Sequence, residues 1–575
     1  MPALPELRFD TYHRYPELTA LLQGLADAHP DTMELRSLGS SYEGRDIWLA
    51  IVTRRSTGPH QHKPAVWVDG NIHSTELSAC SACLYLLAHL LGRDGLDPDV
   101  TEVLDTRTFY VVPRVNPDGP ELVLSERPVH LRSSVRPYPF DEEPVEGLRV
   151  EDIDRDGRIL SMRFLDPNGP WKVCERDPRL LVRREPGDRE GPFFRVVPEG
   201  RMLPGWDRTT IREAPYKHRL DLNRNFPAFW RTEHEQQGAG PYPTSEPEVR
   251  ALVAFIASHP NICHALTFHT YSGVLLRPYS TDSDERFPAE DLRMFRHIGK
   301  KGEQITGYPA VSVYHDFRYH PKTVITGGFD DWMYEHLGAF AWTVELWSPF
   351  RQAGITRGFE VGTKSGDFRF IEWPHDHPLE EDLALLRWSD EKLGGRGYID
   401  WYDYEHPEMG RVQLGGWDFM LAFRNPPPEY LEAELEPFPR WLIWQALSTP
   451  LLGLREEAVI ELGGGHYELR LVVENRGWLP SYVTKLALER NYCRELVAEL
   501  KLPQGVELVS GKLRTFAGQL EGIAYKPLSP VVKPGDYSQD RVLLTWVLKS
   551  PGQASVGVVL RHDRAGRIDR VYRLG

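Results

Sequence analysis

One stretch of the chain indicates both its fold and its chemistry: Val66-Trp-Val-Asp-Gly-Asn-Ile-His73-Ser-Thr-Glu76. Its apolar residues alternate up to Asp69-Gly70, as in a strand leaving a sheet, and a helical pattern follows over residues 77–91. His73 and Glu76 therefore lie where a strand turns into a helix, and their side chains can converge on one metal ion. Alone, a His-x-x-Glu pattern is weak, because in a chain with 21 histidines two solvated polar residues are the commoner explanation.

The composition is that of a soluble globular protein. With 575 residues the chain exceeds one ordinary core, and 41% hydrophobic residues with 16 tryptophans can fill two cores or three. The net charge of −15 and the lack of a long basic run argue against nucleic acid and anionic membranes as partners. We find no secretion signal and no apolar run of membrane-spanning length, so we expect a cytoplasmic protein; the oligomeric state is not indicated.

The five cysteines are sparse and odd in number. Cys80-Ser-Ala-Cys83 has the spacing of half a zinc or redox motif, but it lies within a helical pattern and no second pair accompanies it. We therefore expect buried free thiols.

Strands and helices alternate over the first two thirds of the chain, which predicts an α/β fold with its site at the carboxyl ends of strands. The strand at residues 262–269 ends in His269, and a last buried strand at 340–345 ends in Glu345. His264 faces the opposite side of its strand from His269 and is more simply a core histidine. Several strand ends therefore offer chemistry to one cleft.

Residues 120–215 lack periodicity and are rich in charged residues, proline and glycine, which predicts a long insertion or lid. Within it, Asp152, Asp154 and Asp156 precede a glycine with the spacing of the first half of a calcium-binding loop. The twelfth position of that loop should be glutamate, and Arg163 stands there instead. A bound calcium ion and a plain acidic turn both remain open.

From about residue 455 the pattern becomes purely β, with short strands separated by glycine and proline turns. A segment of roughly 120 residues suits an immunoglobulin-like β-sandwich. We therefore expect a catalytic domain over 1–450 and a β-sandwich domain over 451–575. The second domain carries no chemical motif, so docking or stability is its expected role.

Five short motifs follow one another in a distinctive order. They are His73-x-x-Glu76, Asn223-Arg224, His269-x-Tyr271-Ser272, Gly327-Gly-Phe-Asp-Asp-Trp332 and Thr343-Val-Glu345. Their order resembles that of the zinc carboxypeptidase family, which includes carboxypeptidases A and B. The resemblance covers about residues 8–390 and implies a mixed-sheet catalytic domain with helices on both faces.

The resemblance also implies a zinc site and a catalytic base. His73, Glu76 and His269 would bind one zinc ion per chain and leave one position for water, whose acidity the metal raises. Glu345 would take the proton from that water and deliver it to the leaving amine. The implied enzyme is a zinc metallocarboxypeptidase, a peptide hydrolase whose partner is its peptide substrate.

The family also places arginines around the substrate. One follows an Asn-Pro-Asp-Gly motif and stabilises the oxyanion; Arg132 is the first candidate here and Arg136 the alternative. Asn223 and Arg224 would hold the terminal carboxylate, a task suited to a planar guanidinium. A local ion pair with Asp221 is the structural alternative for Arg224.

Tyr271 and Asp330 are the further candidates for substrate binding. Asp330 falls at the base of the family's specificity pocket, where aspartate favours C-terminal Lys or Arg, although an acid at a helix start is also an ordinary cap. Two positions depart from the family pattern. Thr75 replaces an arginine that usually precedes the second ligand, and Thr323 stands where digestive members carry a mobile tyrosine, with Tyr319 nearby.

Two other functions remain open. A zinc amidohydrolase acting on N-acyl amino acids or cell-wall peptides would use the same metal ligands. A non-catalytic module that binds zinc or peptides is the third possibility, but it would not need Glu345 beside the metal. Release of free amino acids from ordinary peptides distinguishes the carboxypeptidase from both.

Overall fold

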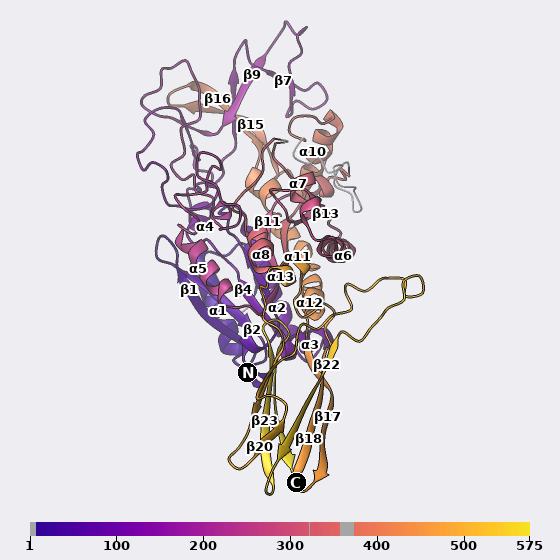
Figure 1. Ribbon diagram of the computed structural model, residues 1–575. Helices are drawn as coiled ribbons and strands as arrows, with labels where there is room; N and C mark the ends of the chain where they lie inside the picture. The colour runs from indigo at the N-terminus through magenta and orange to yellow at the C-terminus, as the bar shows by residue number, and fades with distance from the viewer. Residues whose placement is uncertain (1–6, 321, 357–372) are drawn as a thin grey trace.

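The computed structural model describes residues 7–320, 322–356 and 373–575 (Figure 1). Its centre is an eight-stranded sheet with the order β1-β2-β4-β3-β11-β14-β12-β13. The four middle strands, β4, β3, β11 and β14, run parallel to one another. The pairs β1–β2, β2–β4 and β12–β14 are antiparallel, and the edge strand β13 runs parallel to β12. The strands are β1 (Met33–Ser40), β2 (Asp46–Val52), β3 (Ala65–Gly70), β4 (Thr108–Val112), β11 (Ile262–Thr270), β12 (Val274–Arg277), β13 (Ala310–Ser312) and β14 (Phe340–Leu346).

Helices cover both faces of this sheet because its strands are apolar on both sides. In β3, Val66 and Val68 join one hydrophobic cluster, while Ala65 and Trp67 join the other. The larger cluster includes helices α1 (Tyr15–Ala28), α2 (Leu77–Arg93), α3 (Pro98–Thr106), α6 (Ala289–Thr306) and α12 (Phe438–Ser448). The smaller cluster includes α5 (Pro247–Ala257) and α8 (Phe329–Leu337). The predicted mixed-sheet α/β fold is confirmed.

The turn from β3 into α2 is tightly packed. Gly70 ends the strand, and a Cβ at this position would lie 2.5 Å from the carbonyl oxygen of Ala79 in the helix. The helix can therefore approach the strand end only because residue 70 is glycine. All five cysteines are free and buried, Cys80 and Cys83 within α2, as predicted.

The segment predicted as an irregular insertion contains six short strands, so the expectation of irregular structure was wrong. Four of them join a hairpin that follows the catalytic motifs, giving a six-stranded sheet of order β15-β16-β6-β9-β7-β8 in which β6 pairs with the hairpin strand β16. The other two, β5 and β10, pair with each other. Strands of three to six residues leave too little periodicity to be detected from sequence. They are β5 (Leu148–Val150), β6 (Ser161–Leu165), β7 (Trp171–Val173), β8 (Leu181–Arg183), β9 (Phe193–Pro198) and β10 (Gly200–Met202), and the hairpin is β15 (Tyr398–His406) and β16 (Gly410–Trp417).

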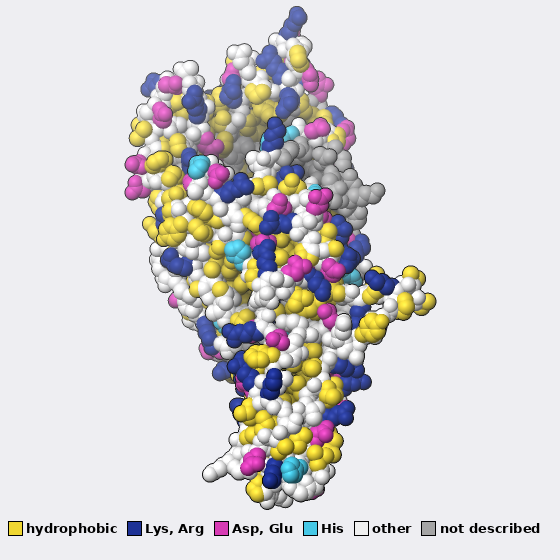
Figure 2. All heavy atoms as spheres, viewed as in Figure 1, with side chains coloured by type: hydrophobic (Ala, Val, Ile, Leu, Met, Phe, Trp, Pro, Cys, Tyr) yellow, Lys and Arg dark blue, Asp and Glu magenta, His cyan; other side chains and the backbone are white. Residues whose placement is uncertain are grey.

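The C-terminal segment forms two antiparallel four-stranded sheets around a third hydrophobic cluster. Burial alternates residue by residue along β18 (His466–Asn475), as expected of a strand with one face in a core. A loop between β21 (Arg514–Phe516) and β22 (Arg541–Lys549) projects from the rest of the chain (Figure 1), and apolar side chains lie on it (Figure 2). Leu528, in this loop, is 98% exposed. The remaining strands are β17 (Leu452–Gly463), β19 (Val497–Lys501), β20 (Glu507–Ser510), β23 (Ala554–His562) and β24 (Gly566–Leu574).

The C-terminal segment contacts the α/β part through hydrogen bonds that are buried or partly buried. Arg564 donates to the carbonyl oxygens of Leu337 and Gly338 at the end of α8. Asp291 of α6 accepts the N–H groups of Lys485 and Leu486 at 2.7 and 3.0 Å. None of the helices in the described ranges combines the length and apolarity of a membrane span.

Candidate metal centre and active site

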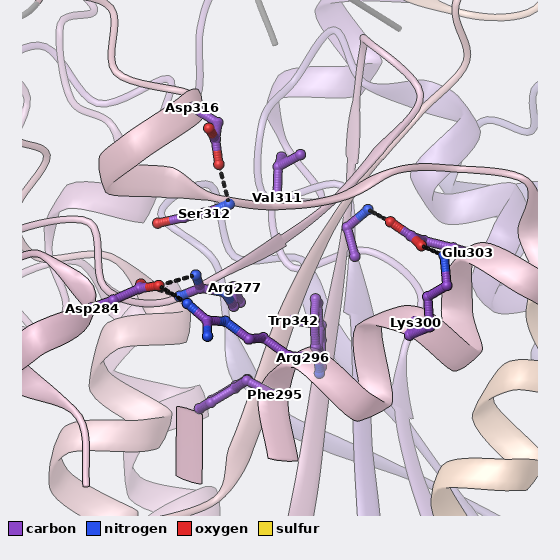
Figure 3. A pocket seen from close by; sticks show the side chains of 11 residues that line it. Arg277, Asp284, Phe295, Arg296, Lys300, Glu303, Val311, Ser312, Asp316 and Trp342 are labelled. Carbon is purple, nitrogen blue, oxygen red and sulfur yellow. Dashed lines mark hydrogen bonds and ion pairs between the residues drawn. The ribbon is translucent and has the colours of Figure 1, made fainter. Parts of the chain in front are cut away.

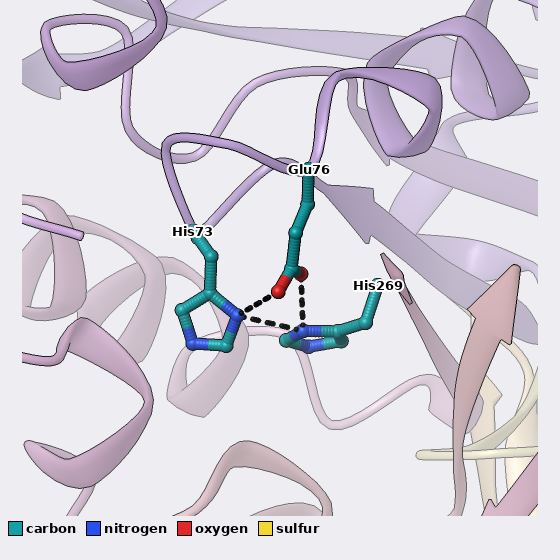
Figure 4. Close-up of side chains that lie close together, drawn as sticks. All are labelled: His73, Glu76 and His269. Carbon is teal, nitrogen blue, oxygen red and sulfur yellow. Dashed lines mark hydrogen bonds and ion pairs between the residues drawn. The ribbon is translucent and has the colours of Figure 1, made fainter. Parts of the chain in front are cut away.

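Three side chains from two distant segments meet at the edge of the central sheet (Figure 4). His73 Nδ1 lies 3.0 Å from Glu76 Oε1, and His269 Nδ1 lies 3.0 Å from Glu76 Oε2. The two Nδ1 atoms are themselves 3.0 Å apart, and each of the three residues is at most 2% exposed. Two imidazole nitrogens and a carboxylate facing one another at this distance form a donor set suited to a cation.

Strand topology brings these residues together. His73 and Glu76 follow the carboxyl end of β3, and His269 is the penultimate residue of β11, which pairs with β3 in parallel. Asp221 Oδ1 lies 3.1 Å from His73 Nε2, which leaves the Nδ1 lone pair free for a metal. Burial alone would raise the pKa of Glu76, but His73 and His269 hold it well below its ordinary value.

Glu345 lies beside the three converging side chains. It is directly opposite His269 in the parallel pair of β11 and β14, so both side chains lie on the same face of the sheet. Its Oε2 is buried and has no hydrogen-bond partner among the described residues. Burial, together with the nearby charge of Glu76, raises the pKa of Glu345 to about 7. An unengaged carboxylate with this pKa can accept and release a proton near neutral pH.

Charged side chains form a row of alternating sign along the site. Arg224 Nη2 lies 4.0 Å from Asp221, and Asp221 Oδ2 accepts a hydrogen bond from Arg132 Nε at 3.1 Å. Arg132 Nη1 then lies 3.3 Å from Glu76 Oε1, and Arg424 Nη1 lies 3.6 Å from the same oxygen. We call these five residues, in the order 224, 221, 132, 76 and 424, the charge row.

The two candidate arginines have different surroundings. Arg132 contacts Asp221 and Glu76, whereas Arg136 forms two hydrogen bonds of 2.9 and 2.6 Å with Glu246. The structure therefore brings Arg132, and not the alternative Arg136, to the converging histidines and glutamate. Burial alone would lower the pKa of Arg132, but its two carboxylate neighbours raise it.

Asn223 and Asp330 lie close together. The side-chain oxygen of Asn223 accepts the N–H of Phe329, and a Cβ on Gly328 would lie near the side chains of both Asn223 and Asp330. Asp330 is buried, which raises its pKa. The residue at the N-cap of α8 is Gly328, so the alternative that Asp330 is the helix cap is wrong. Its carboxylate accepts the N–H of Asp331 and the hydroxyl of Thr343.

Tyr271 lies on the other side of the site, next to Arg424. The Arg424 guanidinium lies 5.2 Å from the centre of the Tyr271 ring, and the ring of Phe419 meets that of Tyr271 edge to face. Neither Arg424 nor Asp221 was predicted to be functional. Asp221 precedes the Asn223-Arg224 motif and was considered only as an ion-pair partner, whereas Arg424 belongs to no motif.

A cavity of about 710 Å³ opens beside Asp221 and Arg132, which contact the converging His73 and Glu76. Arg132, Asp221 and Arg224 line it, and so does Tyr319, which is 57% exposed. Thr323, the position counted back from the family motif, hydrogen-bonds to the carbonyl of His320 and does not line the cavity. A tyrosine is therefore present at the mouth of the cavity although the expected position holds threonine.

A second cavity, of about 190 Å³, lies between α6, β13 and β14 (Figure 3). Its cationic side chains already have partners: Arg277 and Arg296 contact Asp284, and Lys300 contacts Glu303. The cationic groups of this lining are thus paired with neighbouring carboxylates and not directed at a ligand.

The predicted calcium-binding segment is a compact acidic turn. Asp152, Asp154 and Asp156 each offer a carboxylate oxygen within 4.8 Å of the others. Asp152 accepts the N–H groups of three following residues. Glu199, the residue between β9 and β10, accepts the N–H groups of Ile153 and Leu160 at 2.8 Å each. A glutamate from outside the turn therefore joins its two ends. Calcium binding by Asp152, Asp154 and Asp156 remains a prediction.

Comparison with known proteins gives two matches to family models. The family described as zinc carboxypeptidase matches residues 18–138 and 204–358, and a domain of unknown function matches 452–572. The unmatched residues 139–203 contain all six short strands of the insertion.

Individual relatives are distant. Human carboxypeptidase A6 is 24% identical over 361 residues, which are 60% of this chain and 62% of the relative. Carboxypeptidase B of Astacus astacus is 25% identical over 344 residues, 58% of this chain and 86% of the relative. The crystal structure of thrombin-activatable fibrinolysis inhibitor aligns at 18% identity with a TM-score of 0.41, covering 78% of this chain and 76% of that one.

Proposed function

Because the chain belongs to the zinc carboxypeptidase family, we propose that it is a zinc-dependent metallocarboxypeptidase that removes the C-terminal residue of peptides. The observation that carries this proposal is the convergence of His73, Glu76 and His269 with Glu345 alongside. Two imidazole nitrogens that lie 3.0 Å apart, and each 3.0 Å from one oxygen of the same carboxylate, suit one zinc ion with an open coordination position. A base beside that position is needed for hydrolysis but not for binding alone.

Zinc would be held by His73 Nδ1, His269 Nδ1 and the Glu76 carboxylate. When bound, it supplies a Lewis acid that polarises the scissile carbonyl and lowers the pKa of a water molecule. Asp221 orients the His73 ring through its Nε2, and Arg132 holds Asp221 and Glu76 in place from the cavity side. The ligands are thus positioned before the substrate arrives.

Glu345 would transfer the protons of the reaction. Its Oε2 is buried and without a partner among the described residues, so it is free to accept a proton from the attacking water. The same carboxyl group would then protonate the amine that leaves. A pKa of about 7 suits both steps, because the group gains and loses a proton at similar cost near neutral pH.

The arginines would orient the peptide. Arg224 lines the cavity, and with Asn223 it would bind the terminal carboxylate, while Arg132 would stabilise the developing oxyanion. Asp330 and Tyr271 would contact the C-terminal and neighbouring side chains. Recognition of a free carboxylate at one end of the charge row makes the proposed enzyme an exopeptidase.

The test combines metal analysis with peptide hydrolysis. Zinc content is measured together with the release of C-terminal Lys, Arg, Phe, Leu and Glu from a peptide panel, for wild type and Glu345→Gln. We expect one zinc per chain in both proteins and a loss of release of about 10²- to 10⁴-fold in the variant. Glu248→Gln is the matched control, because Glu248 is also buried, has a pKa of about 7 and has an unpartnered Oε2 among the described residues.

The outcomes separate the competing functions. Zinc binding without release from any peptide would replace the carboxypeptidase with an amidohydrolase acting on N-acyl amino acids or cell-wall peptides. Peptide binding without hydrolysis would indicate a non-catalytic module. Equal release by wild type and Glu345→Gln would remove Glu345 from the mechanism.

A further inference from the structure

Arg424 occupies the end of the charge row opposite Arg224. It ends the helical turn η6 (Met420–Arg424), and its side chain is 23% exposed. Nη1 donates to the carbonyl oxygen of Thr270 at 3.1 Å and lies 3.6 Å from Glu76 Oε1. The guanidinium therefore reaches the proposed metal ligands from a segment outside the residues that match the zinc carboxypeptidase family.

The guanidinium has donors to spare. A guanidinium carries five N–H groups, and only Nη1 of Arg424 makes a hydrogen bond to the residues that the structure describes. Arg132 lies closer to Glu76 and also contacts Asp221, so the Glu76 carboxylate already has a cationic neighbour without Arg424. Neutralising Glu76 consequently does not account for the position of Arg424.

The neighbouring residues hold Arg424 in place. The side chain of Asn425 donates to the carbonyl oxygen of Thr75, 350 residues away in sequence, at 2.9 Å and accepts the N–H of Ser78 at 3.1 Å. These two bonds hold η6 against the turn that contains His73 and Glu76 and against the first residues of α2. The rings of Tyr271 and Phe419 lie 5.2 and 5.4 Å from the guanidinium and restrict its orientation. A long cationic side chain is thus pre-organised beside the site.

The order of the charge row gives Arg424 its role. With the substrate carboxylate at Arg224 and the reacting carbonyl at Arg132, the peptide continues toward the Glu76 end of the row. We propose that Arg424 is a substrate-binding residue that donates hydrogen bonds to a backbone carbonyl oxygen on the amino-terminal side of the scissile bond. This inference rests on the proposed function and makes peptides of three or more residues the preferred substrate class.

Thr75 supports this assignment from the opposite direction. It stands where the family pattern has an arginine between the first two ligands, and its own carbonyl oxygen is held by Asn425. The structure thus brings a guanidinium to the turn that lacks one. The side chain comes from a segment more than 300 residues further along the chain.

Binding measurements in the Glu345→Gln protein loaded with zinc test the proposal without requiring turnover. Two ligands share the C-terminal residue that wild type releases fastest: N-acetyl-Ala-Ala-Xaa and N-acetyl-Xaa. Their dissociation constants are compared in the parent, in Arg424→Met and in Arg424→Lys. A charge-assisted hydrogen bond predicts a loss of about tenfold to hundredfold for the tripeptide in Arg424→Met, and a much smaller loss for N-acetyl-Xaa.

Controls separate binding from folding and metal loss. Arg411→Met changes an arginine on β16 whose side chain is 77% exposed, and it should leave both affinities unchanged. Zinc content is measured in every variant. Arg424→Lys keeps the positive charge, so it should retain part of the tripeptide affinity.

Two results would overturn the proposal. Equal losses for both ligands would mean that Arg424 does not distinguish the amino-terminal part of the peptide, and loss of zinc in both variants would make it a counter-charge for Glu76. A parent protein that binds neither ligand would refute the proposed carboxypeptidase itself. Length-dependent loss with zinc retained supports the proposal.

Discussion

Asp221→Asn tests whether Asp221 orients a proposed metal ligand. Asp221 contacts His73 Nε2 and accepts hydrogen bonds from Arg132 Nε and from the N–H of Asn223. Burial alone would raise the pKa of Asp221, but Arg132, Arg224 and His73 hold it well below its ordinary value, so the group is a carboxylate. Asparagine keeps the shape but removes the charge and replaces one acceptor oxygen with a donor.

The size of the effect follows from these contacts. An asparagine oxygen can still face His73, but its NH₂ group then faces Arg132, and one charge-assisted hydrogen bond is lost. Such a bond contributes about 1.5–3 kcal/mol, and loss of a residue that orients a metal ligand typically weakens metal binding about tenfold to hundredfold. We therefore expect the zinc affinity of Asp221→Asn to be about tenfold to hundredfold lower than that of wild type, with the fold retained.

The assay is competition for zinc with a chromophoric chelator at neutral pH. Asp118→Asn is the matched control, because Asp118 is 1% exposed and accepts hydrogen bonds from Arg45, Ser41 and the N–H of Glu43. It should lose stability but keep zinc affinity. If Asp221→Asn bound zinc as tightly as wild type, or no more weakly than Asp118→Asn, the proposed ligand-orienting role would be refuted.

Three further predictions concern other sites. Asp330→Ile should shift release from C-terminal Lys and Arg toward apolar residues; an unchanged ratio of kcat/KM for Lys and Leu would exclude Asp330 from specificity. Burial raises the pKa of Glu434 from 4.5 to about 7, so the wild type should lose up to about 3 kcal/mol of stability as the pH rises from about 4.5 to about 7. Urea unfolding at several pH values should show no such loss for Glu434→Gln. If the free energy of unfolding of wild type and of Glu434→Gln changed in parallel with pH, the prediction would be wrong. Calcium should raise the melting temperature of wild type but not that of Asp154→Asn. If calcium changed both melting temperatures equally, the Asp152–Asp156 segment would be an acidic turn without a calcium site.

The closeness of His73, Glu76 and His269 could be predicted from the sequence because strand patterns locate strand ends. Their two strands are buried on both faces and read as apolar runs, and in a parallel sheet the carboxyl ends of neighbours meet at one edge. Glu345 follows by the same logic, since β14 is the other neighbour of β11. Strand patterns, together with parallel pairing of the strands, therefore predict that these four residues lie close together.

Other parts of the site depend on contacts that no local pattern encodes. Arg132 and Arg136 are four positions apart in an aperiodic segment, and only their partners, Asp221 and Glu246, distinguish them. Arg424 lies in a segment whose sequence resembles no motif, and its place beside Glu76 depends on the bonds of Asn425. Such side chains are found only when the tertiary structure is known.

The charges of the cavity would allow a protein with a net charge of −15 to bind a free carboxylate, as the proposed function requires. Arg132, Arg219 and Arg224 line the cavity against two acids, Glu213 and Asp221, and Asp221 is already engaged by His73 and Arg132. Charges farther away than about 8 Å are largely screened at physiological ionic strength, so the cavity arginines dominate at contact distance. The carboxylate of the proposed substrate would therefore meet a local charge opposite in sign to that of the whole protein. Its affinity should depend on these three arginines much more than on the distant surface acids that make the chain acidic.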